Sequence, residues 1–343
     1  MKRRTLFFLG LSGLAGCTGR GKRRLNVFNW SNYVAPETLP RFEAETGIQV
    51  RYAIYESNEE MLARVLSGNS GWDVVFPSHY YIEPMREMGL LAPVDASRLP
   101  NLAHLDDAFQ RPGWDPAHRW SVPYVWGSCG ILYHPGALPE PRRWADLWDE
   151  RLRGRITMLD DPAEVLGASL KKLGLPLNST SEPELLSAAQ EATRQKPLLR
   201  AYLNAEVRDQ VVAGDVKAAQ LWATVAQQAI DAAPELRFRY PEEGFSLYTD
   251  TAAILKESPR QEFAHQFLDY LLRPEVSASI ASATRTATAN GSGRRLLPPV
   301  VSALETLYPP AETMALGEWF ATMPAAAQRL RDRLWTEIKS STN

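Results

Sequence analysis

Few side chains in this sequence of 343 residues could build a metal site or a disulfide framework. The five histidines are scattered along the chain and show no metal-ligand spacing. There are only two cysteines, and if Cys17 in the N-terminal leader is modified, Cys129 has no partner. Stability must then come from burial of apolar surface, and 343 residues with 45% hydrophobic content are ample for two lobes.

Beyond its first 24 residues, the sequence has no excess of basic over acidic residues. The first 24 residues contain seven Lys and Arg and no acid, while the whole chain has a formal net charge of −2. Subtracting those seven charges leaves −9 for residues 25–343. This balance argues against a nucleic acid as partner and weakly favours a cationic ligand.

The first 17 residues have the layout of a secretory signal. A basic start at residues 2–4 precedes an apolar stretch at 6–15, which is too short to span a membrane. The sequence LAGC, ending at Cys17, resembles a bacterial lipobox, in which cleavage exposes the cysteine for lipid attachment. We therefore expect an exported, membrane-anchored lipoprotein with a flexible tether at 18–24, and the alternative is an ordinary signal peptide with a chance cysteine. Arg3 and Arg4 leave open whether export follows the general or the twin-arginine route.

Strand and helix patterns alternate from residue 25 onward. Apolar runs predict strands at 25–28, 48–54 and 73–76, with helices after Pro36 and after the capping box that begins at Ser57. This order predicts an α/β fold with a parallel or mixed sheet. Extended stretches near 124–133 and 245–255, with no flexible linker, are candidates for two passages between lobes. Further strands are predicted at 156–159 and 221–223, and further helices at 162–173, 182–195, 204–213, 259–272, 274–282, 300–307 and 323–337.

Aromatic and acidic side chains gather at the predicted strand ends. Ligands of open α/β sheets bind beyond the carboxyl ends of the strands, so these positions are candidate site residues. The aromatics of FNWSNYV, for example, are either packing residues or a flat wall for a ligand. No nucleophile beside a base and no Gly-rich phosphate loop accompanies them. The candidate positions are 29–33, 78–81, 160–164, Trp222 and 248–250.

The sequence DPAE at 161–164 has two compatible interpretations. Asp161 and Pro162 suit the start of a helix, and Glu164 completes a capping box. The same placement puts both carboxylates at the positive end of a helix, where we expect them to stay ionised and to hold an amine. Asp250 is likewise either a turn acid or a ligand acid.

Together these stretches resemble the polyamine-binding proteins of bacterial ABC importers, the spermidine/putrescine family. The resemblance covers most of residues 25–320 in the family's order and spacing. It implies an α/β, two-lobed type II periplasmic-binding-protein fold with two chain crossovers, in which residues 25–127 and 247–295 form lobe 1 and residues 128–246 and 296–343 form lobe 2. The matching stretches include FNWSNYVAPETLPRFEAETGI, YESNEEM, WDVVFPSHYYIEPM, VPYVWG, LDDPAEVLGASLKKLG and YTDTAAIL.

The resemblance also implies a ligand site between the lobes, without a catalytic residue, metal or cofactor. Four departures from the family's pattern occur: Asn32 where many members have an acid, Tyr248 for a tryptophan, Phe320 for a glutamine, and Arg285-Thr286 where an aromatic is usual. An arginine facing the pocket would repel a cation. The implied ligand-binding residues are Trp30, Ser31, Asn32, Tyr33, Ser78, Tyr80, Asp161, Glu164, Trp222, Tyr248, Asp250, Thr286 and Phe320.

The function implied by the resemblance is that of a periplasmic or cell-surface solute-binding lipoprotein. It would capture spermidine or putrescine as a monomer and deliver it to an ABC permease with its ATPase. The alternatives are a protein of the same fold for another solute, such as a ferric ion, a sugar or an anion, and a sensor or adhesion module. A carbohydrate-active enzyme is a further alternative, because aromatic platforms with two carboxylates also describe a glycosidase cleft.

Overall fold

The structure is a computed structural model that describes residues 23–136 and 140–341. The leader with Cys17, and the tether up to residue 22, lie outside the described residues, so the expectations about them stay predictions. Within the described part, no helix is both long and apolar enough to pass through a bilayer.

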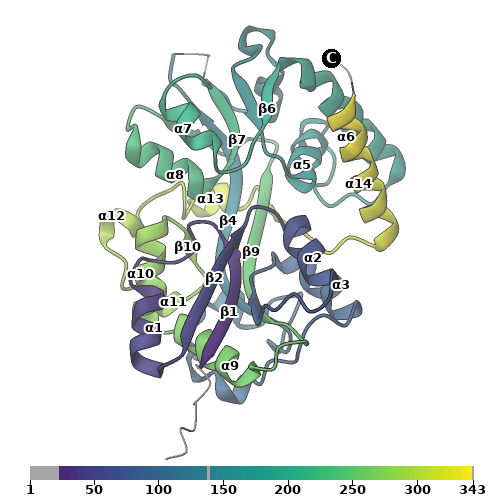
Figure 1. The fold of residues 1–343 in the computed structure, drawn as a ribbon. Helices are drawn as coiled ribbons and strands as arrows, with labels where there is room; N and C mark the ends of the chain where they lie inside the picture. Colours follow the sequence, from purple (N-terminus) through teal and green to yellow (C-terminus); the bar gives the residue numbers. More distant parts are fainter. Residues whose placement is uncertain (1–22, 137–139, 342–343) are drawn as a thin grey trace, which may run out of the picture.

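Two long strands connect the two halves of the molecule (Figure 1). β4 (Val122–Tyr133) and β9 (Phe245–Ile254) pair antiparallel, and every residue in both strands is buried. β9 also pairs with β3 (Val74–Val75) in one half, whereas β4 pairs with β7 (Ala218–Trp222) in the other. The sheet is therefore continuous in the order β2-β1-β3-β9-β4-β7-β5-β6. It is a mixed sheet, and the two-lobed architecture is confirmed.

The first half is built on parallel strands. β1 (Arg24–Trp30) pairs with both β2 (Gln49–Tyr55) and β3, so their carboxyl ends point to the same edge, toward the second half. Figure 1 shows the helices of this half flanking the sheet. They include α1 (Thr38–Thr46), α2 (Asn58–Leu66), α3 (Ile82–Glu87), α4 (Asp107–Gln110), α9 (Gln261–Leu271), α10 (Pro274–Thr284) and α11 (Gly291–Arg294).

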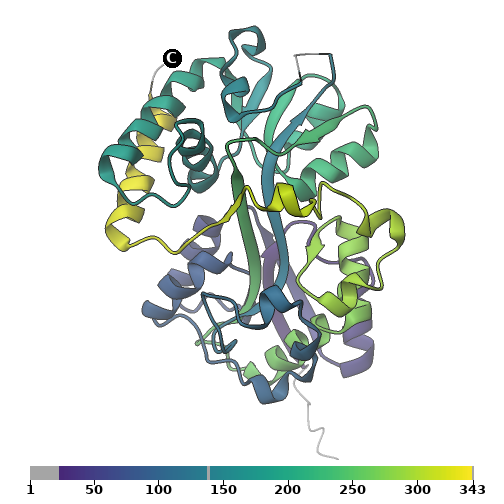
Figure 2. The same ribbon diagram turned by 180° about the vertical axis from the view of Figure 1, so that it is seen from behind.

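The second half repeats this arrangement. β5 (Ile156–Met158) pairs parallel with β7 and with β6 (Leu199–Tyr202), and β8 (Arg237–Arg239) lies against the end of β4. The C-terminal helix α14 packs on α5 and α6, as Figure 2 shows from behind. The helices are α5 (Pro162–Lys172), α6 (Glu182–Gln195), α7 (Val207–Val212), α8 (Ala223–Ala232) and α14 (Ala325–Ser340). The remaining elements are β10 (Ala287–Thr288), β11 (Gly317–Trp319), α12 (Pro299–Ser302) and α13 (Ala311–Met314).

Local sequence signals explain most of the element boundaries. Gly47 ends α1 with φ at 68°, in the left-handed region that glycine adopts without strain. The Ser57 hydroxyl caps α2 by accepting from the Glu60 N–H at 3.1 Å, but the Glu60 carboxylate accepts from the Glu56 N–H instead of closing the capping box on Ser57. The helix predicted at 300–307 is shorter, since α12 ends at Ser302.

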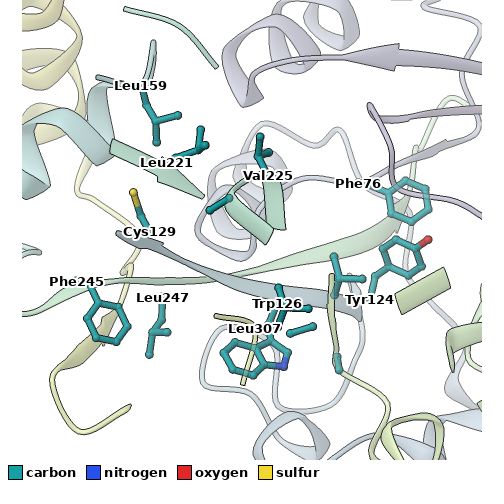
Figure 3. Packing of buried hydrophobic residues seen from close by; sticks show 14 of the residues in the cluster. Phe76, Tyr124, Trp126, Cys129, Leu159, Leu221, Val225, Phe245, Leu247 and Leu307 are labelled. Atoms are coloured by element: carbon teal, nitrogen blue, oxygen red, sulfur yellow. The ribbon is translucent and has the colours of Figure 1, made fainter. Parts of the chain in front are cut away.

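One apolar core extends through the junction of the halves. Figure 3 shows Phe76 and Tyr124 packed on one side of the junction, and Leu159, Leu221 and Val225 on the other. Because these residues belong to the same buried cluster as β4 and β9, the two long strands are fixed in both halves. Residues on these strands are thereby held at defined positions between the lobes. Cys129 lies in this core as a free thiol.

Candidate ligand-binding site

A cavity lies between the two halves, where the carboxyl ends of the parallel strands face each other. Its volume is about 50 Å³, enough for only a few water molecules. Eleven of the thirteen predicted site residues line it: Trp30, Ser31, Asn32, Tyr33, Ser78, Tyr80, Asp161, Glu164, Trp222, Tyr248 and Asp250.

The end of β1 provides an aromatic wall. The Trp30 indole N–H donates to the Phe76 carbonyl at 2.7 Å, and the Trp30 ring lies 4.7 Å from the Tyr55 ring. Trp30 therefore both packs on the core and faces the cavity, so the two interpretations of this stretch apply together. Asn32 follows with φ at 54°, in the left-handed region that asparagine tolerates, and the resulting turn directs Tyr33 toward β9.

Asp250 lies on β9 and is hydrogen-bonded by two hydroxyl groups of the first half. It is 1% exposed and accepts hydrogen bonds from the Ser78 and Tyr33 hydroxyls, both at 2.7 Å. Burial raises its pKa to about 7, and the two hydroxyls partly oppose that rise. No lysine or arginine of the described chain forms an ion pair with it. Asp250 is thus a buried acid without a cationic partner.

Asp161 and Glu164 face the cavity from the start of α5. The Asp161 carboxylate caps the helix by accepting from the N–H groups of Ala163 at 2.8 Å and Glu164 at 3.0 Å. The Glu164 carboxylate does not close the capping box. It accepts instead from the Trp222 indole N–H at 3.2 Å and the Ser246 hydroxyl at 2.7 Å. Helix capping therefore accounts for Asp161 but not for Glu164.

The helix N-terminus does not hold the pKa values of these two acids at their ordinary level. Burial raises the pKa of Glu164, and the adjacent charge of Asp161 raises it further. Burial and the charge of Glu59 likewise raise the pKa of Asp161. Desolvation outweighs the favourable helix end because Glu164 is only 3% exposed. A cation entering the cavity would remove this penalty.

Two further tyrosines line the cavity together with the acids. After the larger effect of burial, the charges of Asp250 and Glu164 raise the pKa of Tyr248 further, so this ring is near both carboxylates. Gly127 makes room for this ring, since a Cβ there would lie 2.5 Å from the Tyr248 hydroxyl oxygen. Tyr80 also lines the cavity and packs on Phe320 with ring centroids 5.2 Å apart.

Comparisons with known proteins show the family to which this chain belongs. The family model described as "Bacterial extracellular solute-binding protein" matches residues 37–300. The chain belongs to this family. It is 34% identical over 319 residues to the spermidine/putrescine-binding periplasmic protein of Escherichia coli (strain K12), covering 92% of this chain and 91% of that protein. The family is one of solute-binding proteins and not of enzymes.

Solved structures show the same fold for this solute-binding protein. A putative spermidine/putrescine ABC transporter protein from Listeria monocytogenes superposes with a TM-score of 0.89 at 30% identity, covering 93% of this chain and 99% of that one. The TpPotD lipoprotein of Treponema pallidum superposes with a TM-score of 0.81 at 26% identity, covering 92% and 99%.

Two predicted site residues do not line the cavity of this solute-binding protein. Thr286 is buried, and its hydroxyl pairs with that of Thr284 at 2.8 Å. Phe320 lies behind Tyr80, in a small cluster with Tyr248. Arg285, which could have repelled a cation, ends α10 with φ at 57° and pairs with Asp231 at 2.5 Å, so it is not among the cavity-lining residues.

Six lining residues were missed by the sequence analysis. Glu56 and Asn58 follow β2, and the strand-end rule applied to that strand would have found them. The Asn58 side chain donates to the Ser78 hydroxyl at 3.0 Å, so it orients a partner of Asp250. The others lie near Trp222 on the second half. The six are Glu56, Asn58, Ala205, Thr224, Val225 and Gln228.

Proposed function

We propose that this solute-binding protein captures a polyamine in the cavity and delivers it to an ABC permease with its ATPase. The observation that carries the proposal is a set of acids from β9 and α5 that form no ion pair within the described part of the chain, in a cavity with no lysine or arginine among its lining residues. The names of the similar E. coli and L. monocytogenes proteins support it.

A polyamine fits the chemistry of these residues. Burying an ammonium group is costly unless a carboxylate receives it, and Asp250 and the Asp161–Glu164 pair offer two such positions. The tryptophan and tyrosine rings that line the same cavity can cover the methylene groups and add about 0.5–2 kcal/mol each through cation–π attraction. Because the cavity lies between the two lobes, the lobes would part to admit the ligand and close around it afterwards.

The same lining weighs against the alternatives. An anion-binding protein would need arginine, lysine or free N–H groups in the cavity, and the lining residues include neither arginine nor lysine. Glycosidic chemistry is disfavoured because the family that the chain matches is one of solute-binding proteins. We infer that the protein binds its ligand without converting it.

Location and anchoring are further parts of the proposal. The leader supports export followed by lipidation at Cys17, and a structural relative from T. pallidum is itself called a lipoprotein. More than one acyl chain on Cys17 would be needed for stable attachment. We propose a monomeric protein tethered outside the cytoplasm, whose closed form is recognised by the permease.

A thermal-shift panel tests the ligand class directly. Putrescine, cadaverine, spermidine and spermine should raise the melting temperature, whereas amino acids and sugars should not. A ligand at a hundred times its Kd stabilises the fold by about 2.7 kcal/mol. Glu164→Gln should abolish most of the shift, while the exposed control Glu305→Gln should keep it. A shift produced by sugars or anions and by no polyamine would reject the proposal.

A further inference from the structure

The carboxylates that line the cavity differ in their depth. Asp250 and Glu164 are 1% and 3% exposed, so they define a buried interior. Glu56 also lines the cavity, but its side chain is exposed to solvent, so it marks the mouth. The Ser31 hydroxyl donates to a carboxylate oxygen of Glu56 at 3.1 Å and thereby orients it.

A side chain of the second half contacts the backbone of Glu56. The Asn204 side chain donates to the Glu56 carbonyl at 3.3 Å and accepts from the Asp160 N–H at 3.0 Å, which fixes the Glu56 backbone at the edge of the closed cavity. Partial burial at the mouth raises the pKa of Glu56, the hydrogen bond from Ser31 opposes that rise, and the charges of Glu206 and Glu60 add to it. No cation forms a salt bridge with Glu56 in the described part of the chain.

We propose that Glu56 receives the outermost ammonium group of a triamine and so makes this site favour a triamine over a diamine. The inference rests on the proposed polyamine function. The two interior positions match the two ammonium groups of a diamine, and a third carboxylate benefits only a ligand that extends from the interior to the mouth. The ammonium group of a triamine at this position would also reduce the repulsion between the carboxylates of Glu56 and Glu206 when the lobes close.

The contribution of Glu56 should be moderate and sensitive to salt. An ion pair in contact with solvent contributes about 1 kcal/mol, and favourable geometry adds to this, which corresponds to about five- to tenfold in Kd. Screening by salt weakens exposed charges more than buried ones. The advantage of a triamine over a diamine should therefore decrease as the salt concentration rises.

Titration calorimetry with spermidine and putrescine tests the inference on the full protein. Glu56→Gln should weaken spermidine binding by about five- to tenfold and leave putrescine binding within about twofold. Glu206→Gln is the matched control, because it removes a charge at the same mouth without removing a cavity-lining residue. It should have little effect on either ligand.

The outcomes separate this inference from the proposed function. Equal loss for both ligands in Glu56→Gln, no loss for either, or the same spermidine loss in Glu206→Gln would overturn the role of Glu56. If the wild-type protein binds neither amine, the proposed function itself fails. Because Glu56 is exposed, the melting temperature of the ligand-free variant should match that of the wild type, which excludes misfolding as the cause of a loss.

Discussion

Replacement of Asp250 by asparagine should make the ligand-free protein more stable at pH 8 while it weakens amine binding. Burial raises the pKa of Asp250 to about 7 from its ordinary value of 3.8. The folded state therefore holds a proton that the unfolded state has lost between about pH 4 and pH 7. The stabilisation from that proton is complete below the unfolded pKa and is lost as the pH rises through about 7.

The size of this effect follows from the pKa difference. About three pH units at ~1.4 kcal/mol each give about 4 kcal/mol of lost stability above pH 7, as an order of magnitude. Asparagine avoids the charge but fits the Ser78 and Tyr33 hydroxyls less well, at a cost of about 1–2 kcal/mol. Asp250→Asn should therefore gain about 2–3 kcal/mol at pH 8 and gain nothing at pH 5.

Denaturant unfolding followed by circular dichroism at both pH values measures this difference. Asp107→Asn, at an exposed position of the same half, is the control and should change stability little at either pH. In the same samples, Asp250→Asn should bind the amine about ten- to a hundredfold more weakly, because a charge-assisted hydrogen bond is lost. Equal destabilisation at pH 5 and pH 8 would refute the reasoning, since it would mean that Asp250 is already ionised in the empty cavity.

Two other predictions follow from the same geometry. Amine binding near pH 7 should release protons, because the ligand lowers the raised pKa values of Asp250 and Glu164; binding enthalpies that are identical in buffers of different ionisation enthalpy would contradict this. Gly127→Ala should weaken binding about tenfold or more, because its Cβ would lie 2.5 Å from the Tyr248 hydroxyl oxygen, and the ring must move. Gly113→Ala, with no atom within 4 Å of the added Cβ, is its control, and equal affinities in the two variants would show that the Tyr248 position is unimportant.

The sequence predicted the general location of the site because strand ends in an α/β fold meet at one edge. This rule placed the ends of β1 and β7 correctly without any knowledge of their partners. It was not applied to the end of β2, because the segment that contains Glu56 was interpreted only as the start of α2. A capping signal and a cavity-lining position occur there within three residues, and the capping signal was considered alone.

The direction of individual side chains could not be predicted from local patterns. Glu164 leaves the capping box because Trp222 and Ser246, which are 58 and 82 residues away, donate to its carboxylate. Arg285 is drawn to Asp231, 54 residues away, and so does not line the cavity. The pKa directions of the buried acids depend on total burial, which arises only when the two halves come together.

The buried acids Asp250 and Glu164 also make closure of the lobes unfavourable unless a cationic ligand is bound. In the closed form, Asp250 and Glu164 are buried without a cation, so ionising them destabilises that form above pH 7. An open form would return both carboxylates to water and remove this cost. A bound polyamine removes the cost within the closed form instead, so its differential affinity for that form supplies the free energy of closure. If the proposed function holds, the acids that receive the ligand are also those that keep the empty lobes apart, and neutralising Asp250 should favour a closed but empty protein.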